Sequence, residues 1–325
     1  MEVLVCIYPV LDASYLPWQQ ELDPRFVLQI AYVGNKSTHQ LQLIDINQPT
    51  PGLPSPDSSQ SRRPFNAQFP DLRQINTISS NGWANYNSLQ VVLKSNDFHG
   101  LTTQTAFTWS HNLDTASEVD DFFGTSGYVP QDATNLAGSY GNSEFDQRRA
   151  LIITYIYQIP FPKNGNRFTY VLKDWQVSGT TTFRDGLAAP VLSADGGSGT
   201  DNFHERPDCI GPIHYQLSDF SMPYVLAGAF APEAPGTFGN CPRNPIVAPG
   251  LTNWDFAIQR TFKLGERFSF EFRTSFFNAF NHPNFGEPSP DLSTRITATS
   301  DDGSFDSHFG AGGPRNIQFG AKLRW

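Results

Sequence analysis

Apolar and polar residues alternate strictly along the last segment of the chain, 315–325. One parity is apolar and the other polar: Ile317, Phe319, Ala321, Leu323 and Trp325 against Asn316, Gln318, Lys322 and Arg324. Successive side chains of a strand point to opposite faces, so this pattern predicts a strand with one apolar and one polar face. Because chain ends are loosely ordered unless something holds them, we expect neighbouring strands to hold this one.

The same alternation recurs in segments of about ten residues, and the strongest is the Phe-rich segment 266–280. No segment shows helical periodicity, and the frequent Thr, Phe, Tyr, Val and Ile suit a pleated surface. The sequence therefore predicts an all-β antiparallel fold of about ten to eleven strands. The predicted strands are 15–22, 25–34, 39–47, 86–95, 101–111, 147–158, 174–184, 253–263, 266–280 and 315–325.

The connections between these segments alternate between short and very long. Short turns are predicted at 21–25, 33–39, 95–100 and 263–267, with a longer one at 159–170, and long connections at 48–85, 112–146, 185–251 and 281–314. Structureless connections of this length are uncommon in compact soluble domains. A transmembrane β-barrel has short periplasmic turns and long extracellular loops. Counting back from a last strand that runs toward the periplasm places all four long connections on the extracellular side.

Composition supports a membrane-facing surface. Aromatic residues make up 14% of the chain and charged residues only 16%, compared with about 25% charged in soluble domains. Trp109, Trp175 and Trp254 lie near strand ends, where aromatic girdles mark the membrane interfaces. The polar parity is expected to line a lumen. There Asp255, Glu271 and Arg273, with Arg260 nearby, are expected to form a ladder of charged residues.

Several other classes of protein are disfavoured. The net charge is −9 and no Lys/Arg cluster stands out, which argues against nucleic-acid binding. No window of about 18 apolar residues predicts a transmembrane helix. Residues 1–14 lack the features of a signal peptide and stay unassigned, with the barrel portion expected over 15–325.

Cysteine usage leaves two alternatives open. Cys209 and Cys241 lie in one long connection rich in Pro and Gly. They are expected either to form a disulfide bond, as an oxidising compartment allows, or to remain two thiols. Cys6 is expected to be free.

The order and spacing of several motifs resemble the Oar-like, TonB-dependent receptor barrels abundant in Acidobacteria. The resemblance extends from about Trp18 to Trp325, and the segments that carry it are "NYNSLQVVLKS", "GLTTQTAFTWSHNLDTAS", "FDQRRALIITYIYQIPF", "WQVSGTTTFRDGLAAPV", "GLTNWDFAIQRTFKLGERFSFEFRTSFFNAFNHPNFG" and "RNIQFGAKLRW". It implies a barrel of about 22 strands, preceded by a carboxypeptidase-regulatory-like domain and a plug. It also implies uptake energised through a periplasmic TonB box. This sequence matches only the carboxyl-terminal part of that barrel.

The terminal Trp325 has two compatible interpretations. Terminal aromatic residues on amphipathic strands resemble the signal by which the barrel-assembly machinery recognises its clients, and Phe319 and Leu323 share the face of Trp325. The alternative is an edge aromatic residue that packs against the first strand where the barrel closes.

No metal, cofactor or catalytic site is predicted. His282 is expected to form a turn with Pro283, and the pair His204/Glu205 lacks the convergent spacing of metal ligands. The oxygen-rich segment 300–306 lacks the spacing of a calcium loop. No GxSxG, HExxH or phosphate-binding loop is present, so the chain is not expected to be an enzyme.

These observations favour an outer-membrane transporter or receptor barrel. Its expected partners are outer-membrane lipid, the barrel-assembly machinery, the TonB complex through upstream parts, and an unknown external ligand for which a saccharide or peptide is suggested. Two alternatives remain open: a passive porin-like or adhesive barrel, and a soluble secreted carbohydrate-binding β-protein.

Overall fold

The structure is a computed structural model. It describes residues 10–53, 56–117, 130–161, 173–193, 197–202, 205–216, 224–225, 227–286, 288 and 313–325. Regular structure in these ranges is nearly all β-strand, beside the short helix α1 (Pro56–Ser61) and two 3-10 turns, Leu136–Ser139 and Ala227–Ala229. Within these ranges, no helix combines the length and hydrophobicity needed to cross a membrane. The all-β prediction is confirmed.

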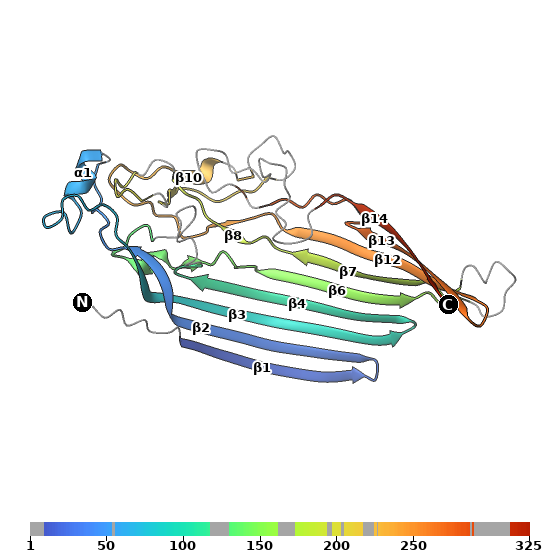
Figure 1. The fold of residues 1–325 in the computed structure, drawn as a ribbon. Coiled ribbons are helices and arrows are strands. Elements are labelled where there is room, and N and C mark those ends of the chain that lie inside the picture. Colours follow the sequence, from blue (N-terminus) through green and yellow to red (C-terminus); the bar gives the residue numbers. More distant parts are fainter. Residues whose placement is uncertain are drawn as a thin grey trace.

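Nine long strands form one antiparallel sheet, and each pairs with the next long strand along the chain (Figure 1). The two-residue β5 (Gly141–Asn142) pairs with the end of β4 and brings the sheet to ten strands. The long strands, in spatial order, are β1 (Val10–Asp23), β2 (Phe26–Asp45), β3 (Asn76–Phe98), β4 (Leu101–Asp114), β6 (Arg149–Gln158), β7 (Gln176–Arg184), β12 (Leu251–Leu264), β13 (Phe268–Phe277) and β14 (Asn316–Arg324).

The connections separate into two sets, one at each end of the strands. Short connections join β1 to β2, β3 to β4 and β12 to β13, and Figure 1 shows them at the right, beside the carboxyl terminus, where β6 also ends and β7 begins. Gly100 and Gly265 both adopt φ 85° in such turns, a conformation that favours glycine. The strand ends that are joined by the four long connections, 46–75, 115–148, 185–250 and 278–315, lie at the other end, as predicted. We call the two ends the short-turn end and the long-loop end.

One predicted turn is wrong. Segment 33–39 lies inside β2, which is continuous and pairs with β3 along its length, so the predicted strands 25–34 and 39–47 are one strand. Gly34 and Asn35 suggested a turn from local sequence, but hydrogen bonding to both neighbouring strands keeps them extended. The register shifts near His39, which has φ 60°, so the strand bulges there without reversing. The paired strand accordingly begins at Asn76, ten residues before the predicted 86.

Pairing register places the apolar positions of neighbouring strands on one face. Val91 of β3 pairs with Ile30 of β2 and with Phe107 of β4, and Phe256 of β12 pairs with Phe276 of β13. A slip of one residue in any pair would exchange the two faces. We call them the apolar face and the polar face. The apolar face carries, one residue from each long strand, Trp18, Ile30, Val91, Phe107, Leu151, Phe183, Phe256, Phe270 and Phe319.

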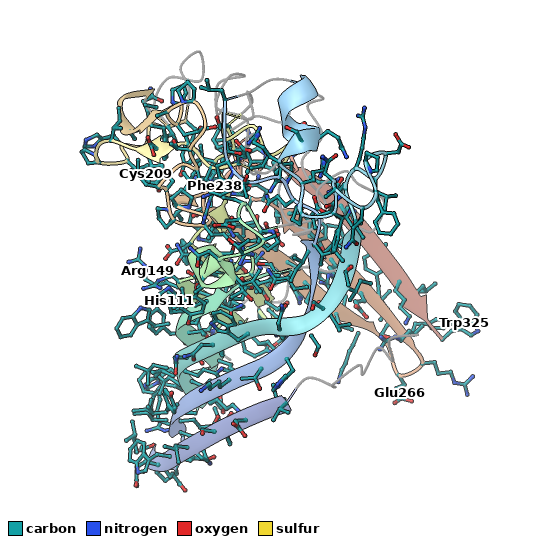
Figure 2. The ribbon with its side chains drawn as sticks, turned by 90° about the vertical axis from the view of Figure 1, so that its left-hand side faces the viewer. His111, Arg149, Cys209, Phe238, Glu266 and Trp325 are labelled. Atoms are coloured by element: carbon teal, nitrogen blue, oxygen red, sulfur yellow. A yellow bond between two sulfur atoms is a disulfide. The ribbon has the colours of Figure 1, made fainter. Side chains whose placement is uncertain are left out.

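The sheet is curved but not closed. β1 and β14 form its two edges, and among the described strands each pairs with one long neighbour only. In Figure 2 the first and the last strands stand on opposite sides of a hollow, and the labelled Arg149 points away from that hollow. Because Arg149 pairs with Trp109 on the apolar face, the apolar face is the convex one.

Candidate functional site

The connection 185–250 has a small hydrophobic core of its own at the long-loop end. It is framed by two short strand pairs, β8 (Ala188–Ala189) with β11 (Ile246–Val247) and β9 (Asp208–Cys209) with β10 (Phe230–Ala231). The hydroxyl of Tyr224 donates to the carbonyl of Val247 at 2.8 Å, and burial raises the pKa of this tyrosine, which keeps the hydroxyl a donor. The cluster consists of Ala189, Val191, Tyr224, Val225, Ala229, Phe230, Cys241 and Ile246.

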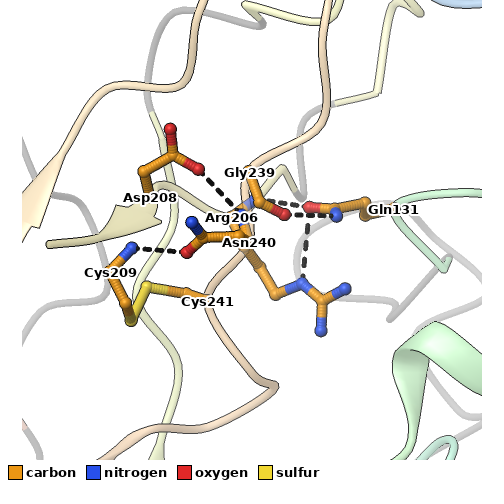
Figure 3. Close-up of a disulfide and its surroundings, with 7 residues drawn as sticks. All are labelled: Gln131, Arg206, Asp208, Cys209, Gly239, Asn240 and Cys241. Atoms are coloured by element: carbon orange, nitrogen blue, oxygen red, sulfur yellow. Dashed lines mark hydrogen bonds between the residues drawn. A yellow bond between two sulfur atoms is a disulfide. The ribbon is translucent and has the colours of Figure 1, made fainter.

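A disulfide bond joins Cys209 to Cys241 at a Cα–Cα distance of 4.9 Å (Figure 3). Around it, the side-chain oxygen of Asn240 accepts from the backbone N–H of Cys209 at 2.8 Å. The backbone N–H of Asn240 in turn donates to the carboxylate of Asp208 at 2.9 Å. This is the pair of cysteines that the sequence singled out, and Cys6 lies outside the described residues.

Gln131 links three long connections through its buried side-chain amide and its backbone carbonyl. Its Nε2 donates to the carbonyl of Gly239 at 3.0 Å, and its Oε1 accepts from the backbone N–H of Arg206 at 2.9 Å (Figure 3). Its backbone carbonyl accepts from Nε2 of Gln48 at 2.8 Å. Connections 46–75, 115–148 and 185–250 are therefore fastened to one another, and we call them together the loop assembly.

Two neighbouring arginines strengthen the attachment of 46–75 to 185–250. Nη2 of Arg63 lies 2.7 Å from a carboxylate oxygen of Asp201, and Nη2 of Arg62 donates to the carbonyl of Gly199 at 2.7 Å. The Arg63 side chain is only 3% exposed. A buried charge is costly unless it is paired, so this ion pair holds the two connections in one arrangement.

Arg243 fixes the loop assembly to the sheet. Its buried guanidinium forms an ion pair with Asp114, the last residue of β4. It also donates to the Asp114 carbonyl at 3.0 Å and to the Ser117 hydroxyl at 2.5 Å. The ion pair between Arg243 and Asp114 therefore fixes the position of 185–250 relative to β4.

Arg206 and Arg243 both line a small pocket of about 30 Å³ between the loops, together with Gln131 and Asn244. That volume accommodates about two water molecules or one group of similar size. Burial and the neighbouring charge of Arg243 both lower the pKa of Arg206. Among the described residues no carboxylate forms an ion pair with Arg206, whose donors reach Gln131 and the carbonyl of Gly138. The pocket therefore has the charge to accept a small anionic group.

A second polar cluster contains two buried carboxylates. Glu205 is fully buried and accepts from the backbone N–H of Ser198 and from the hydroxyl of Thr200, both at 3.0 Å. Burial raises the pKa of Glu205, and the charge of Glu233 raises it further. Glu205, which was considered with His204 as a metal-ligand pair, therefore forms hydrogen bonds inside the loop assembly. His204 itself is outside the described ranges. Across the described part of the chain, no group of three or more His, Cys, Asp or Glu side chains has the proximity to hold a metal ion.

The three residues predicted to face the lumen lie on the polar face, but they do not form the expected ladder. Glu271 pairs with Arg324 of β14 at 3.0 Å, and Arg273 donates to the hydroxyl of Ser275 at 3.1 Å. Asp255 accepts from the backbone N–H of Asn278 at 2.8 Å, which caps the end of β13. The three residues therefore contact other partners, and the predicted ladder of charged residues is wrong.

Arg260 was also expected beside that ladder, and this expectation is wrong. In register it lies opposite Phe272 of β13, on the apolar face. Its guanidinium carbon lies 4.1 Å from the centre of the Phe262 ring, a distance typical of a cation–π contact.

The tryptophans predicted at the membrane interfaces divide between the two ends of the strands. Trp254 stacks edge-on against Phe183 and Phe280 at the long-loop end, and Trp109 pairs there with the first residue of β6. Trp175, at the short-turn end, lies 6.4 Å from Phe262 between ring centres. Trp254 and Phe262 are eight positions apart on β12, about 26 Å along a strand, close to the roughly 25 Å apolar band of outer-membrane barrels.

The three residues of the predicted assembly signal lie at a free edge of the sheet. Phe319, Leu323 and Trp325 are 75%, 51% and 87% exposed. Phe319 and Leu323 belong to β14, and Trp325 directly follows it. β14 pairs only with β13 among the described strands, so β1 does not cover these residues. His282, a rejected metal candidate, lies in a turn held by the side chain of Asn278. The Asn278 amide donates to the His282 carbonyl and accepts from the His282 backbone N–H, both at 2.9 Å. Segment 300–306 is outside the described residues.

Sequence patterns missed the residues that organise the loop assembly. Gln131, Arg206, Arg243 and Asp114 lie in three different parts of the chain, and no local spacing relates them. The remaining signal was that Arg206 and Arg243 flank the two cysteines closely in sequence.

A family model described as an outer membrane beta barrel domain matches residues 9–318. No curated protein matches the chain. Solved structures that match the chain include the outer membrane transporter YddB from Escherichia coli (TM-score 0.48, 10% identity, 98% of this chain and 33% of that one). Another is the ferric-catecholate import receptor Fiu from Escherichia coli K12 (TM-score 0.43, 12% identity, 97% of this chain and 27% of that one).

The chain thus spans a third or less of the length of these two structures. The family model, by contrast, covers nearly the whole chain. In outer-membrane barrels a convex apolar band faces lipid, short turns face the periplasm and long loops face outward, which is the arrangement of this sheet. The chain belongs to the outer membrane β-barrel domain family, and its place is the outer membrane.

Proposed function

We propose that the chain is the carboxyl-terminal part of the barrel of a TonB-dependent transporter or receptor of the Oar-like type, and that its loop assembly binds the external ligand. The resemblance of its motifs to that family supports the proposal. So does the joining of three long connections around one polar pocket. The observation that carries the proposal is that the buried Gln131 and a disulfide bond fasten these connections into one arrangement around that pocket.

The pocket indicates the chemical class of the ligand. Arg206 has no carboxylate partner among the described residues, and Arg243 adds a second guanidinium to the lining. Arginine binds carboxylates and phosphates with paired hydrogen bonds. A pocket of about 30 Å³ admits one such group, while the rest of the ligand lies outside it. We therefore propose an acidic saccharide or an acidic peptide.

The binding experiment uses charged probes and their uncharged matches. Hexagalacturonate and hexaglutamate are titrated into the detergent-solubilised chain by calorimetry, with maltohexaose and hexaglycine as neutral counterparts. At least one acidic probe is expected to bind, and Arg206→Gln is expected to weaken binding about tenfold, since bonds to charged groups contribute roughly 1.5–3 kcal/mol. Arg73→Gln, an exposed arginine in the same assembly but outside the pocket, is the matched control. Equal binding of acidic and neutral probes would contradict the acidic ligand.

The direction of the edge strands bears on how the barrel closes. β1 and β14 both run from the long-loop end to the short-turn end. If a second copy of the chain completed the barrel, its β1 would lie beside β14 in parallel pairing. Barrels of this class are antiparallel, so a second copy does not complete this one. An odd number of further strands fits between these two edges, and a barrel of about 22 strands leaves roughly 13. Extending the chain with the sequence encoded immediately upstream should then produce heat-modifiable gel mobility, which the chain alone should lack.

The same upstream sequence tests energy coupling. A plug domain and a TonB box encoded there in the same reading frame would support uptake through the TonB complex. Their absence would favour the passive porin-like or adhesive barrel. A folded, monodisperse chain in buffer without detergent would favour the soluble carbohydrate-binding protein.

The barrel-assembly machinery is the remaining proposed partner, through Phe319, Leu323 and Trp325. Deleting Trp325 should reduce the amount of chain inserted into the outer membrane of intact cells. Trp18→Ala, on the opposite edge strand, is the control. Equal losses would favour simple edge packing over a terminal signal.

A further inference from the structure

A groove of about 650 Å³ opens at the long-loop end, outside the loop pocket described above. Its lining includes Phe107 and Trp109 of β4 together with Arg148, Arg149 and Asp185. Both aromatic residues belong to the apolar face, since Phe107 pairs with Leu151 and Trp109 lies two positions further along β4. The groove therefore lies on the lipid-facing side of the sheet at its outer rim, and not in the hollow.

The charge of this groove differs from that of the whole chain. The protein has a net charge of −9, yet the groove lining carries two arginines and one carboxylate. The Arg149 side chain is 67% exposed and Arg148 is 39% exposed. In Figure 2 Arg149 projects outward from the convex face. A basic site at the level of the interfacial tryptophans suits an anion that lies in the plane of the lipid headgroups.

Each arginine keeps donors for such an anion. Arg149 binds Asp185 at 2.7 Å through Nε and at 3.3 Å through Nη2, which leaves Nη1 available. Arg148 lies 3.8 Å from Asp146, beyond hydrogen-bond range. Guanidinium groups hold phosphate through paired hydrogen bonds, and this is why arginine is frequent in phosphate sites.

The geometry points to a binding site for the phosphorylated headgroup of an outer-leaflet lipid. Arg148 and Arg149 hold its phosphate. Its acyl chains lie along the apolar face and extend from Trp109 and Phe107 toward the short-turn end. From these two residues the apolar face continues to Leu89 and Val91 of β3 and, through Leu151 of β6, to Phe183 of β7, which is why we infer a lipid in place of a soluble phosphate. This inference stands on the outer-membrane location and is independent of ligand uptake.

The test measures binding of lipid A in mixed detergent micelles by native mass spectrometry. The doubly phosphorylated lipid and its dephosphorylated form are compared. The chain should bind the phosphorylated lipid about tenfold more tightly, and Arg148→Gln/Arg149→Gln should remove that preference. The matched control is Arg25→Gln/Arg267→Gln at the short-turn end, where Arg25 likewise pairs with an exposed aspartate, Asp23, at 3.4 Å. The control should keep full binding.

A second variant keeps the test decisive if the double substitution disturbs folding. Asp185→Asn removes the carboxylate that competes for Arg149, while the backbone contacts of Asp185 to Arg149 and Gln147 remain. Its affinity for the phosphorylated lipid should rise several-fold. Equal affinity for both lipid forms, an unchanged affinity in Asp185→Asn, or displacement of the lipid by an equimolar amount of inorganic phosphate would overturn the proposal.

Discussion

The sheet and the loop assembly treat their apolar side chains in opposite ways. The long strands expose large apolar residues such as Trp109 and Phe319, at 56% and 75%, on one convex face. The loop assembly encloses its apolar residues in a small core, with Ile246 fully buried, and adds a disulfide bond. Lipid can cover the first set, whereas the second meets water and must bury its own apolar surface. The loop assembly is therefore built like a small secreted domain on a membrane-facing support.

The disulfide bond should produce the largest effect, and it should be confined to the loop assembly. Cys209→Ser/Cys241→Ser removes a crosslink between residues separated by 32 positions, worth about 3–4 kcal/mol in the loop-closure picture. Hydrogen exchange should accelerate in 185–250 and remain slow in the long strands. Cys6→Ser is the control. Faster exchange throughout β12 and β13 would show that the two regions unfold as one unit.

A charge placed on either face of β12 should separate the lipid-facing side from the wet side. Ile258 lies on the apolar face midway between Trp254 and Phe262, and Gln259 is its neighbour on the polar face. Ile258→Arg should lower the free energy of unfolding by about 2–4 kcal/mol in lipid vesicles. Gln259→Arg should change it by less than about 0.5 kcal/mol. Urea titration followed by tryptophan fluorescence measures both, and equal losses would contradict the assignment of faces.

The pH dependence of stability should distinguish the loop assembly from the sheet. Burial raises the pKa of Glu205 in the folded state above its ordinary value of 4.5. Between pH 4.5 and this raised pKa, the folded state therefore binds more protons than the unfolded state. The stability of the loops should then fall as the pH rises through that window. Proteolytic resistance of 185–250, measured from pH 4.5 upward, should show this fall, and Glu205→Gln should flatten it. The exposed Glu266→Gln in the β12–β13 turn should leave the profile unchanged.

The smallest effect is expected on the polar face of the sheet. Glu271→Gln removes an ion pair to Arg324 in which the two side chains are 29% and 58% exposed. Such exposed pairs contribute between zero and about 1 kcal/mol, so the loss should be below about 0.5 kcal/mol by the same urea titration. A loss well above 1 kcal/mol would mean that the face is dry, contrary to a water-filled hollow.

Much of the sheet was predictable because its signals are local. Alternation marked β4, β6, β7, β12, β13 and β14 to within a few residues, and connection lengths placed the long loops at one end. The error at 33–39 has a clear cause. Gly34 and Asn35 favour a turn locally, yet they hydrogen-bond to β1 and β3, whose partner residues are distant in sequence.

The sequence by itself determined the all-β class, the two faces of each strand, the division into short turns and long loops, and the two cysteines worth pairing. These follow from the two-residue period of a strand and from turn chemistry, which act between neighbours in the chain. Only the tertiary structure decided the continuity of β2, the position of Arg260 opposite Phe272, and the meeting of Gln131, Arg206 and Arg243 at one pocket. Those depend on pairing register and on contacts between residues up to 129 positions apart, which no local pattern encodes.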